Sequence, residues 1–455
     1  MIYKRINAEG LAHLSYFIGS ENEAVIIDTR RDCQIYIDIA KQEDVKIQYI
    51  FETHRNEDYV IGSLELAQLT GAEIYHGPWP DFKYGHKLKD RQEFYVGNLK
   101  VIAIHTPGHT PGCMSYAFAD LTSGEAAIFV CTGDTLFVSD VGRTDFGGLE
   151  KRREWSENLY NSIFNKLLPL GDHVILCPAH GSGSVCGGNI AEREWSTLGL
   201  ERLMNPLLQL SKEQFIEQKV NEHHEIPPYF RKMEQYNLEG PPVLRNLPEP
   251  KLLSPTEFQK LMDKDAVVVD TRTPPAFGSA HINGSYSIWL EGLPMFAGWV
   301  LPYDQSILLV LKERDQLETV VRYLFRMGYD MIEGYILGVE TWYTEALPLK
   351  HLGLLTVQDL KTRLEKDNDL TLLDVRSDEE WNSEHIEGAI HLYVGHIEEH
   401  INEILTDQTT AVICRIGTRA SLGASILQRK GYTDIHVVLG GMVAWQNAGY
   451  TITKQ

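Results

Sequence analysis

Short apolar runs alternate with amphipathic stretches along most of the chain, a pattern typical of mixed α and β structure. In the first half, residues 24–28 and 49–51 predict buried strands. Residues 240–250 contain four prolines and one glycine. Proline interrupts helices and central strands, so this segment predicts a linker and a domain boundary.

The chain repeats itself beyond the linker. Val-Val-Asp-Thr-Arg at 268–272 corresponds to Leu-Leu-Asp-Val-Arg at 372–376, an offset of 104 residues. The same offset places His-Ile-Asn-Gly at 281–284 on His-Ile-Glu-Gly at 385–388. Two copies of a unit of about 100 residues are too few and too large for a solenoid. We therefore predict two duplicated globular domains, each with a parallel α/β sheet.

A single cysteine lies at a strand-to-helix junction of the second copy. Residues 411–413 predict a buried strand, and residues 421–430 predict a helix. Cys414 follows the strand, where parallel α/β sheets receive ligands and where the first amides of a helix favour an anion. We expect Cys414 to act as a nucleophile there.

The loop that begins at Cys414 supports this interpretation. It reads Cys-Arg-Ile-Gly-Thr-Arg. Gly417 permits a tight turn that directs N–H groups inward, while Arg415 and Arg419 add positive charge around the sulfur. These features favour a thiolate or a persulfide anion.

The first copy lacks this chemistry. It presents Leu311 where the second presents Cys414, and residues 312–316 contain neither a cysteine nor a glycine. Residues 250–349 are therefore predicted to be a structural or interface domain.

Three segments in the first half each place His or Asp just after an apolar strand. They contain His54, His109 and Asp134, and a later segment, Pro-Ala-His-Gly, contains His180. One such histidine usually has only a structural role, but three segments in this order indicate a metal site.

Composition limits the classes of partner. The 455 residues favour about three domains, and the 42 basic and 63 acidic residues give a net charge of −21, which opposes binding to nucleic acid or an anionic membrane. No stretch approaches the roughly 20 apolar residues of a membrane span. The six cysteines are scattered, which fits reduced thiols. We expect a soluble cytoplasmic protein.

Residues 352–455 resemble the rhodanese family. The resemblance rests on Asp-Val-Arg at 374–376, His-Ile-Glu-Gly-Ala at 385–389, the Cys414 loop, and Leu-Gly-Gly-Met-Val-Ala-Trp at 439–445. It implies sulfur transfer through a persulfide on Cys414.

Residues 1–200 resemble the metallo-β-lactamase superfamily, whose αββα sandwich holds metals at one edge of its two sheets. In dinuclear zinc members the first motif reads His-x-His-x-Asp-His, but here Asn56 and Tyr59 replace two of the histidines. This departure disfavours a two-zinc hydrolase. Persulfide dioxygenases of the superfamily use one iron ion and share a stretch like residues 133–145.

The resemblance implies mononuclear Fe(II) held by His54, His109 and Asp134, a set like the facial triad of non-haem iron oxygenases. Zinc is the alternative metal. Asp58 and His180 occupy former second-metal positions and are expected to hydrogen-bond to the metal ligands rather than to bind metal.

Three further residues have open roles. Tyr59 could donate a hydrogen bond towards bound oxygen or sulfur, or simply fill space. Arg143 is expected to hold the substrate or the site loop, or to pair with a neighbouring aspartate. Cys186, on a flexible glycine-rich loop, could relay sulfur, although an inert loop thiol is the preferred interpretation.

The expected architecture combines α/β and α+β domains. It comprises an N-terminal metallo-β-lactamase αββα sandwich with a helical extension (1–245), a silent rhodanese-like domain (250–349) and an active rhodanese domain (352–455). This arrangement resembles fused persulfide dioxygenase–sulfurtransferases. Such an enzyme would oxidise a glutathione, coenzyme A or bacillithiol persulfide with O2 to sulfite and, through Cys414, form thiosulfate in sulfide detoxification. We also expect a homo-oligomer.

Two alternatives stay open at this point. The first is a zinc-dependent thioester hydrolase of the glyoxalase II kind with an appended sulfurtransferase. The second is a sulfurtransferase in which the N-terminal domain is a non-catalytic docking scaffold.

Overall fold

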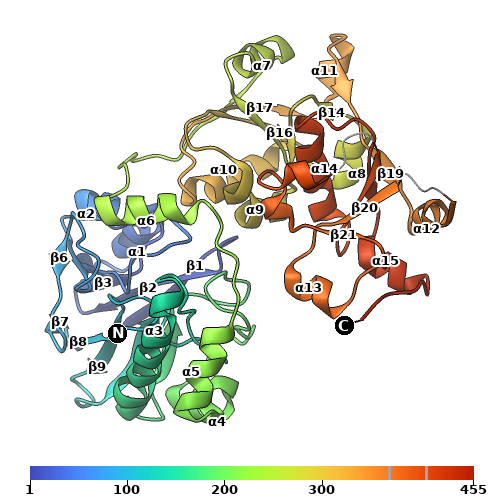
Figure 1. Ribbon diagram of the computed structural model, residues 1–455. Helices are drawn as coiled ribbons and strands as arrows, with labels where there is room; N and C mark the ends of the chain where they lie inside the picture. Colours follow the sequence, from blue (N-terminus) through green and yellow to red (C-terminus); the bar gives the residue numbers. More distant parts are fainter. Residues whose placement is uncertain (367–369, 405–407, 455) are drawn as a thin grey trace. The chain divides into compact units, whose positions relative to one another are not determined.

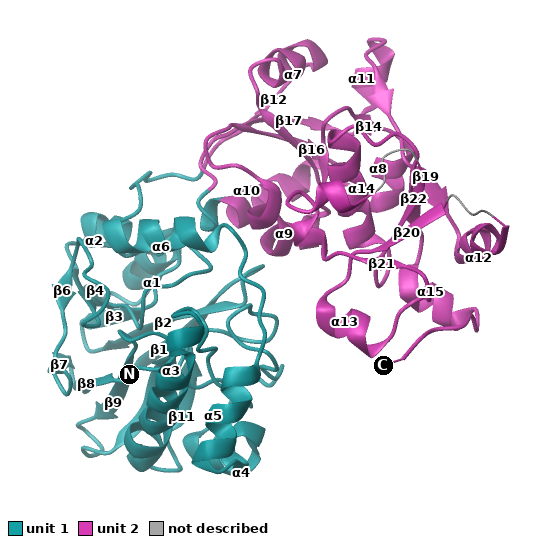
Figure 2. Cartoon of the chain, viewed as in Figure 1, with its two compact units in different colours: residues 1–247, 325–328 teal, residues 248–324, 329–455 magenta. Residues whose placement is uncertain are grey.

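The computed structural model describes residues 1–366, 370–404 and 408–454, which form two compact units. Unit 1 comprises residues 1–247 and 325–328, and unit 2 comprises 248–324 and 329–455 (Figure 2). The segment predicted as a linker, residues 240–250, contains no helix or strand, because α6 ends at Glu239 and β12 begins at Lys251. None of the described helices is both long and apolar enough to cross a membrane.

Unit 1 contains two sheets (Figure 1). The first has the order β1 (Ile2–Ala8), β2 (His13–Ser20), β3 (Glu23–Ile27), β4 (Lys46–Phe51), β5 (Glu73–His76) and β6 (His86–Lys87). The second has the order β11 (Ile175–Pro178), β10 (Ala127–Gly133), β9 (Met114–Asp120), β8 (Leu99–His105) and β7 (Glu93–Val96). The helices are α1 (Gln34–Gln42), α2 (Ser63–Thr70), α3 (Leu149–Ser162), α4 (Leu198–Met204), α5 (Lys212–Asn221) and α6 (Phe230–Glu239).

Alternation along β3 shows how the layers form. Val25 and Ile27 pack between the two sheets with Phe51 and Tyr116, whereas Ile26 packs on the outer face towards α1. Successive side chains of a strand point to opposite faces, so one apolar run serves two interfaces. A third apolar cluster joins the outer face of the second sheet to α3 and α5. The predicted αββα sandwich is confirmed.

Unit 2 repeats one parallel sheet. The first copy has the order β12 (Lys251–Leu252), β17 (Ile332–Leu337), β16 (Ile307–Leu311), β13 (Val267–Asp270) and β15 (Tyr286–Ser287). The second has the order β19 (Gly353–Leu355), β23 (Ile435–Val438), β22 (Thr409–Ile413), β20 (Leu370–Asp374) and β21 (Ile390–His391). The matching strand orders confirm the two predicted rhodanese-like folds.

Helices connect the strands of both copies. In the first they are α7 (Pro255–Met262), α8 (Pro274–Ser279), α9 (Leu293–Val300), α10 (Leu317–Arg326) and α11 (Glu340–Thr344). In the second they are α12 (Val357–Lys366), α13 (Asp378–Ser383), α14 (Thr418–Arg429) and α15 (Gly441–Asn447). The short strands β14 (His281–Ile282) and β18 (Leu349–Lys350) pair antiparallel.

The Asp-x-Arg pair of each copy has a structural role. In the second copy, Arg376 forms a bidentate pair with Asp374, with Nη2 donating to Oδ2 at 2.6 Å, and also donates to the Glu384 carbonyl that follows α13. Asp270 and Arg272 repeat the pair in the first copy. Because both pairs are buried and hydrogen-bonded, they fix the end of the next helix rather than face a substrate.

Candidate functional site

The predicted metal ligands converge in unit 1 at the ends of strands. His54 follows β4, His109 lies between β8 and β9, and Asp134 directly follows β10. Asp134 Oδ2 is 3.6 Å from His54 Nε2 and 3.6 Å from His109 Nε2. All three side chains are buried. The fold therefore brings together three groups that are distant in the sequence.

Neighbouring groups orient both imidazoles. Thr53 donates its hydroxyl to Asp28 Oδ2 at 2.8 Å, so the same hydroxyl oxygen accepts the proton of His54 Nδ1 at 2.9 Å. His109 Nδ1 donates to the carbonyl of Arg143 at 2.9 Å. Each Nδ1 carries the proton, which leaves each Nε2 lone pair directed into the cluster, as metal-binding histidines require.

The donor atoms fit a cation. His54 Nε2, His109 Nε2 and Asp134 Oδ2 are buried and have no hydrogen-bond partner among the described residues. Buried polar atoms are normally paired, so three converging unpaired lone pairs indicate a missing ligand. Burial opposes charge on Asp134, but His180 and His54 outweigh it and lower the pKa of this carboxyl. Burial also lowers the pKa of His54 to about 4, which keeps its imidazole neutral.

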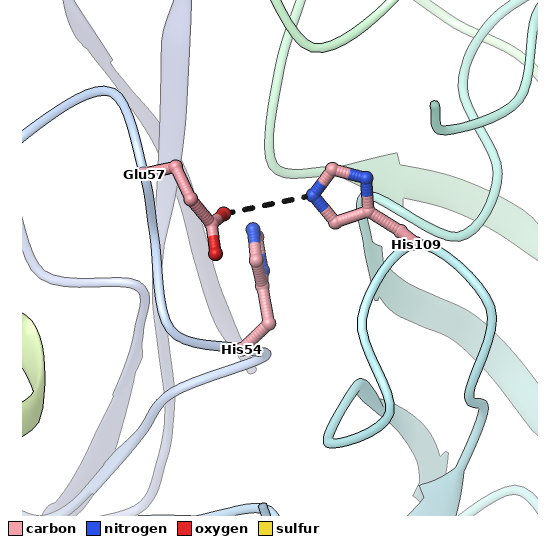
Figure 3. Close-up of side chains that lie close together, drawn as sticks. All are labelled: His54, Glu57 and His109. Carbon is pink, nitrogen blue, oxygen red and sulfur yellow. Dashed lines mark ion pairs between the residues drawn. The ribbon is translucent and has the colours of Figure 1, made fainter. Parts of the chain in front are cut away.

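Glu57 is a further candidate ligand that the sequence analysis missed. Its carboxylate lies with His54 and His109 in a group whose donor atoms are within 4.8 Å of one another (Figure 3). Glu57 Oε2 is 3.8 Å from His109 Nε2 and has no hydrogen-bond partner among the described residues. The only sign of this ligand in the sequence is the spacing His-x-x-Glu from His54. Because the chain contains many acidic residues, this spacing is a weak indication of a metal ligand.

Asp58 and His180 are connected to the metal cluster through Asp134. His180 Nδ1 donates to Asp134 Oδ1 at 2.7 Å, and His180 Nε2 lies 3.0 Å from Asp58 Oδ2. This chain of contacts holds the Asp134 carboxylate in place. Asp58 and His180 also form, with Cys186, a group whose donor atoms lie within 4.8 Å of one another. Tyr59 stacks on His13 with ring centroids 3.9 Å apart, and its buried hydroxyl has no hydrogen-bond partner among the described residues.

Arg143 is committed to structural contacts. Its Nε and Nη2 donate to the two carboxylate oxygens of Asp145, each at 2.7 Å, and Nη1 donates to the carbonyls of Val185 and Glu225. Of the expected roles, the ion pair and the loop contacts are present, and the guanidinium is not free to hold a substrate. Its backbone carbonyl instead orients His109.

Cys186 lies in the wall of the cluster. Its thiol is fully buried, packs with Phe137 and Ile190, and belongs to a group with His109 and Asp134 whose donor atoms are within 4.8 Å of one another. Burial, and then the nearby acidic groups, raise the pKa of this thiol well above its ordinary value. The glycine loop folds inward and buries the sulfur, and both the inert thiol and the sulfur relay stay predictions.

The Cys414 loop cradles the sulfur as expected. The Gly417 N–H donates to Cys414 Sγ at 3.1 Å, and Gly417 has a φ of 105°, a region that favours glycine. Cys414 is buried at the start of α14, whereas Arg415 is exposed at the rim. A backbone donor and a helix N-terminus both favour a negative sulfur.

Arg419 differs from the expectation. Its two terminal nitrogens donate to the two carboxylate oxygens of Glu380, at 2.6 and 2.8 Å. The Glu380 carboxylate therefore offsets much of the positive charge that Arg419 would otherwise present to the Cys414 sulfur. Arg419 ties the first turn of α14 to α13, so its main role is to position the loop.

The silent copy supports the other side of α14. The hydroxyl groups of Ser287 and Ser421 are 2.7 Å apart, and the Ser287 N–H donates to the Ser425 hydroxyl at 3.1 Å. The ring of His281 lies 2.6 Å from Gln428 Oε1. Residues 420–427 of α14 are all buried. These contacts agree with the predicted interface role of the first copy.

The register identifies the silent counterpart of Cys414. Asp270 of β13 pairs with Val310, and Asp374 of β20 pairs with Ile413. The next residues, Leu311 and Cys414, are therefore equivalent, as the alignment of the two strands predicted.

Comparison with known proteins divides the chain in the same way. Residues 8–180 match the metallo-beta-lactamase superfamily, and residues 254–345 and 356–448 match the rhodanese-like domain. A crystal structure of a metallo-beta-lactamase from Staphylococcus aureus subsp. aureus COL is 28% identical and covers 74% of this chain and 98% of that chain, with a TM-score of 0.66.

Two curated relatives are similar to unit 1. Persulfide dioxygenase ETHE1, mitochondrial, from Bos taurus is 28% identical over 210 residues, which cover 44% of this chain and 74% of that protein. Hydroxyacylglutathione hydrolase GloC from Haemophilus influenzae is 29% identical over 210 residues, which cover 41% of this chain and 88% of that protein. Similarity by itself therefore does not separate the oxidative from the hydrolytic activity.

Proposed function

Because the chain combines a metallo-beta-lactamase domain with two rhodanese-like domains, we propose that it is an iron-dependent persulfide dioxygenase and sulfurtransferase. The observation that carries this proposal is the convergence of three buried, unpaired donor atoms, on His54, His109 and Asp134, in a chain that also holds a sulfur cradle at Cys414.

We assign His54, His109 and Asp134 as the metal ligands. Two imidazoles and one carboxylate leave coordination positions open, which is the donor set of non-haem Fe(II) oxygenases. Bound Fe(II) would supply the oxygen and redox chemistry that zinc lacks. Glu57 is close enough to His109 to contact the ion or a group bound beside it.

The chain's own residues orient and protect this site. Thr53 and the Arg143 carbonyl fix both imidazole tautomers, and His180 holds Asp134. The cluster is buried, so bulk water is excluded and electrostatic interactions inside it are strengthened.

Cys414 would carry out the transfer step. Its thiolate attacks the outer sulfur of a persulfide R–S–SH; a bond from Sγ to that sulfur forms, the S–S bond of the donor breaks, and the thiolate RS⁻ leaves. Sulfite then attacks the outer sulfur of the Cys414 persulfide, which gives thiosulfate and returns the Cys414 thiolate. The Gly417 N–H stabilises the anionic sulfur in both states.

A zinc thioester hydrolase is the second candidate, favoured by the similarity to the GloC hydrolase. The positions 56 and 59, where a dinuclear site would need histidines, hold Asn56 and Tyr59. Neither offers an imidazole, and Tyr59 stacks on His13 instead. The geometry supports the dioxygenase better.

An oxygen electrode tests the proposal. Anaerobically prepared, iron-loaded protein should consume O2 when given glutathione, coenzyme A or bacillithiol persulfide, with one O2 used per sulfite formed. Zinc-loaded protein should consume none. Thioester hydrolysis by the zinc form, together with no O2 uptake by the iron form, would contradict the proposal and favour the hydrolase.

Cys186 is proposed to contact the persulfide substrate. We expect Cys186→Ser to raise the KM for persulfide by roughly three- to tenfold, the effect of one lost contact of about 1 kcal/mol. Iron content should stay unchanged. Cys113→Ser, which replaces another buried cysteine of the same unit, is the matched control. Unchanged rates and products at all persulfide concentrations would rule out this role.

A further inference from the structure

Two buried cysteines of unit 1 lie side by side on neighbouring strands. Cys131 of β10 and Cys177 of β11 are register partners in a parallel pair, and both face the core between the two sheets. Neighbouring strands are about 4.8 Å apart, within the Cα separation of about 4.4–6.8 Å that a disulfide spans. The two cysteines are therefore close enough along neighbouring strands for a disulfide to join them.

This dithiol is connected to the metal cluster through the backbone. Cys131 of β10 is three residues before Asp134, and Cys177 of β11 is three residues before His180. Asp134 and His180 are hydrogen-bonded to each other. A disulfide between Cys131 and Cys177 would therefore affect the positions of Asp134 and His180 at the metal cluster.

Tyr3 covers the dithiol on its outer side. Tyr3 Oη lies 3.2 Å from Cys177 Sγ. Burial, and then the neighbouring Cys177, raise the pKa of Tyr3, so the phenol keeps its proton and donates to the sulfur. Tyr3 therefore places a hydrogen-bond donor directly on the Cys177 sulfur.

Tyr3 and Cys177 lie at the edges of the two sheets. β1, which carries Tyr3, and β11, which carries Cys177, are both edge strands. Tyr3 lines a cavity of about 450 Å³ together with Arg5, Tyr16 and the half-exposed Trp195. Tyr3 lies between this cavity and Cys177, because its side chain lines the cavity and its hydroxyl contacts the sulfur.

The remaining cysteines of unit 1 differ, and Cys186 belongs to the wall of the metal cluster. Cys33 packs in the apolar cluster beneath α1, and the Cys113 sulfur accepts the N–H of Thr110. Burial raises the pKa of the Cys131 thiol well above its ordinary value, so Cys131 is the protonated, slower partner. Cys177 is the thiol that is in contact with Tyr3, a lining residue of the cavity.

We propose that Cys131 and Cys177 form a second sulfur-accepting site, which a low-molecular-weight persulfide oxidises to a disulfide. Cys177 Sγ attacks the outer sulfur of R–S–SH to form Cys177–S–SH, while the donor S–S bond breaks and R–S⁻ takes the thiol proton. Cys131 then attacks Sγ of Cys177, the Cys131–Cys177 bond forms, and hydrosulfide leaves with the Cys131 proton. Two thiols are oxidised and one sulfane sulfur is reduced to sulfide.

The proposal rests on the proposed function only in taking a persulfide as the oxidant. The test uses the full-length chain, metal-free and anaerobic, so that no dioxygenase activity is needed. Glutathione persulfide is added, the sample is denatured and alkylated, and the peptides are mapped by mass spectrometry. Conversion of Cys414 to its persulfide in the same sample shows that the donor is active.

We expect the peptides that contain Cys131 and Cys177 to be recovered as a linked pair, with hydrosulfide released. In Cys131→Ser, Cys177 should instead gain the mass of one sulfur atom. Cys113→Ser is the matched control and should keep the linkage. Tyr3→Phe should slow linkage roughly fivefold, the size of one lost hydrogen bond. Recovery of Cys131 and Cys177 as free thiols, after Cys414 has reacted, would overturn the proposal; an unchanged rate in Tyr3→Phe would overturn the route past Tyr3.

Discussion

Asp134→Asn is expected to reduce bound iron and persulfide-dependent O2 uptake by at least about 100-fold. The amide cannot supply the charged oxygen that now lies 3.6 Å from both His54 Nε2 and His109 Nε2. Loss of a partner that only supports a ligand already costs about 10- to 100-fold in metal affinity, so loss of a ligand charge sets a higher minimum. Elemental analysis and an oxygen electrode measure the two effects separately.

The other active site of the same variant provides the control. Transfer of sulfur from a persulfide to sulfite at Cys414 should be unchanged in Asp134→Asn, because Cys414 and the contacts of its loop lie in unit 2. Iron content and O2 uptake close to those of the unaltered protein would show that Asp134 is not a ligand. Loss of both activities together would indicate misfolding and not loss of a metal ligand.

Cys414→Ser is expected to lower sulfur transfer to sulfite by roughly 1,000-fold or more, because serine cannot form the persulfide. Oxygen uptake should continue, and sulfite should accumulate in place of thiosulfate. Quantifying both products during O2 uptake measures this change directly.

Cys33→Ser is the matched control for Cys414→Ser, since it alters a buried cysteine at the start of α1 that takes no part in the proposed chemistry. Thiosulfate should form normally in that variant. Undiminished thiosulfate in Cys414→Ser would instead mean that another group transfers the sulfur.

Local patterns were enough to predict most of the fold. The 104-residue offset predicted two equivalent sheets, and the register of Asp270 and Asp374 confirms the equivalence of Leu311 and Cys414. Periodicity and repetition are encoded in neighbouring residues, so a single sequence reveals them. The same holds for the cradle at Gly417, which is only three residues from Cys414.

Contacts between segments that are far apart in the chain could not be predicted from the sequence. Glu380 and Arg419 are 39 residues apart, and their pairing changes the electrostatics that the loop alone had implied. The sequence around Cys186 predicted a flexible glycine-rich loop, but tertiary packing places its side chain among Phe137 and Ile190. Such contacts depend on which segments of the chain come together in the fold. Residue types and their spacing along the chain do not determine this.

The contacts of α14 bear on how the two copies tolerate substitution. The loop of the silent copy, residues 312–316, is largely exposed, so it accepts side chains of many kinds. Ser287 is buried against Ser421 and Ser425, and a larger residue there would push against the helix that begins at the persulfide cradle. We therefore expect related proteins to have many different residues at positions 312–316 of the silent copy. We expect few different residues at Ser287, which contacts the active copy.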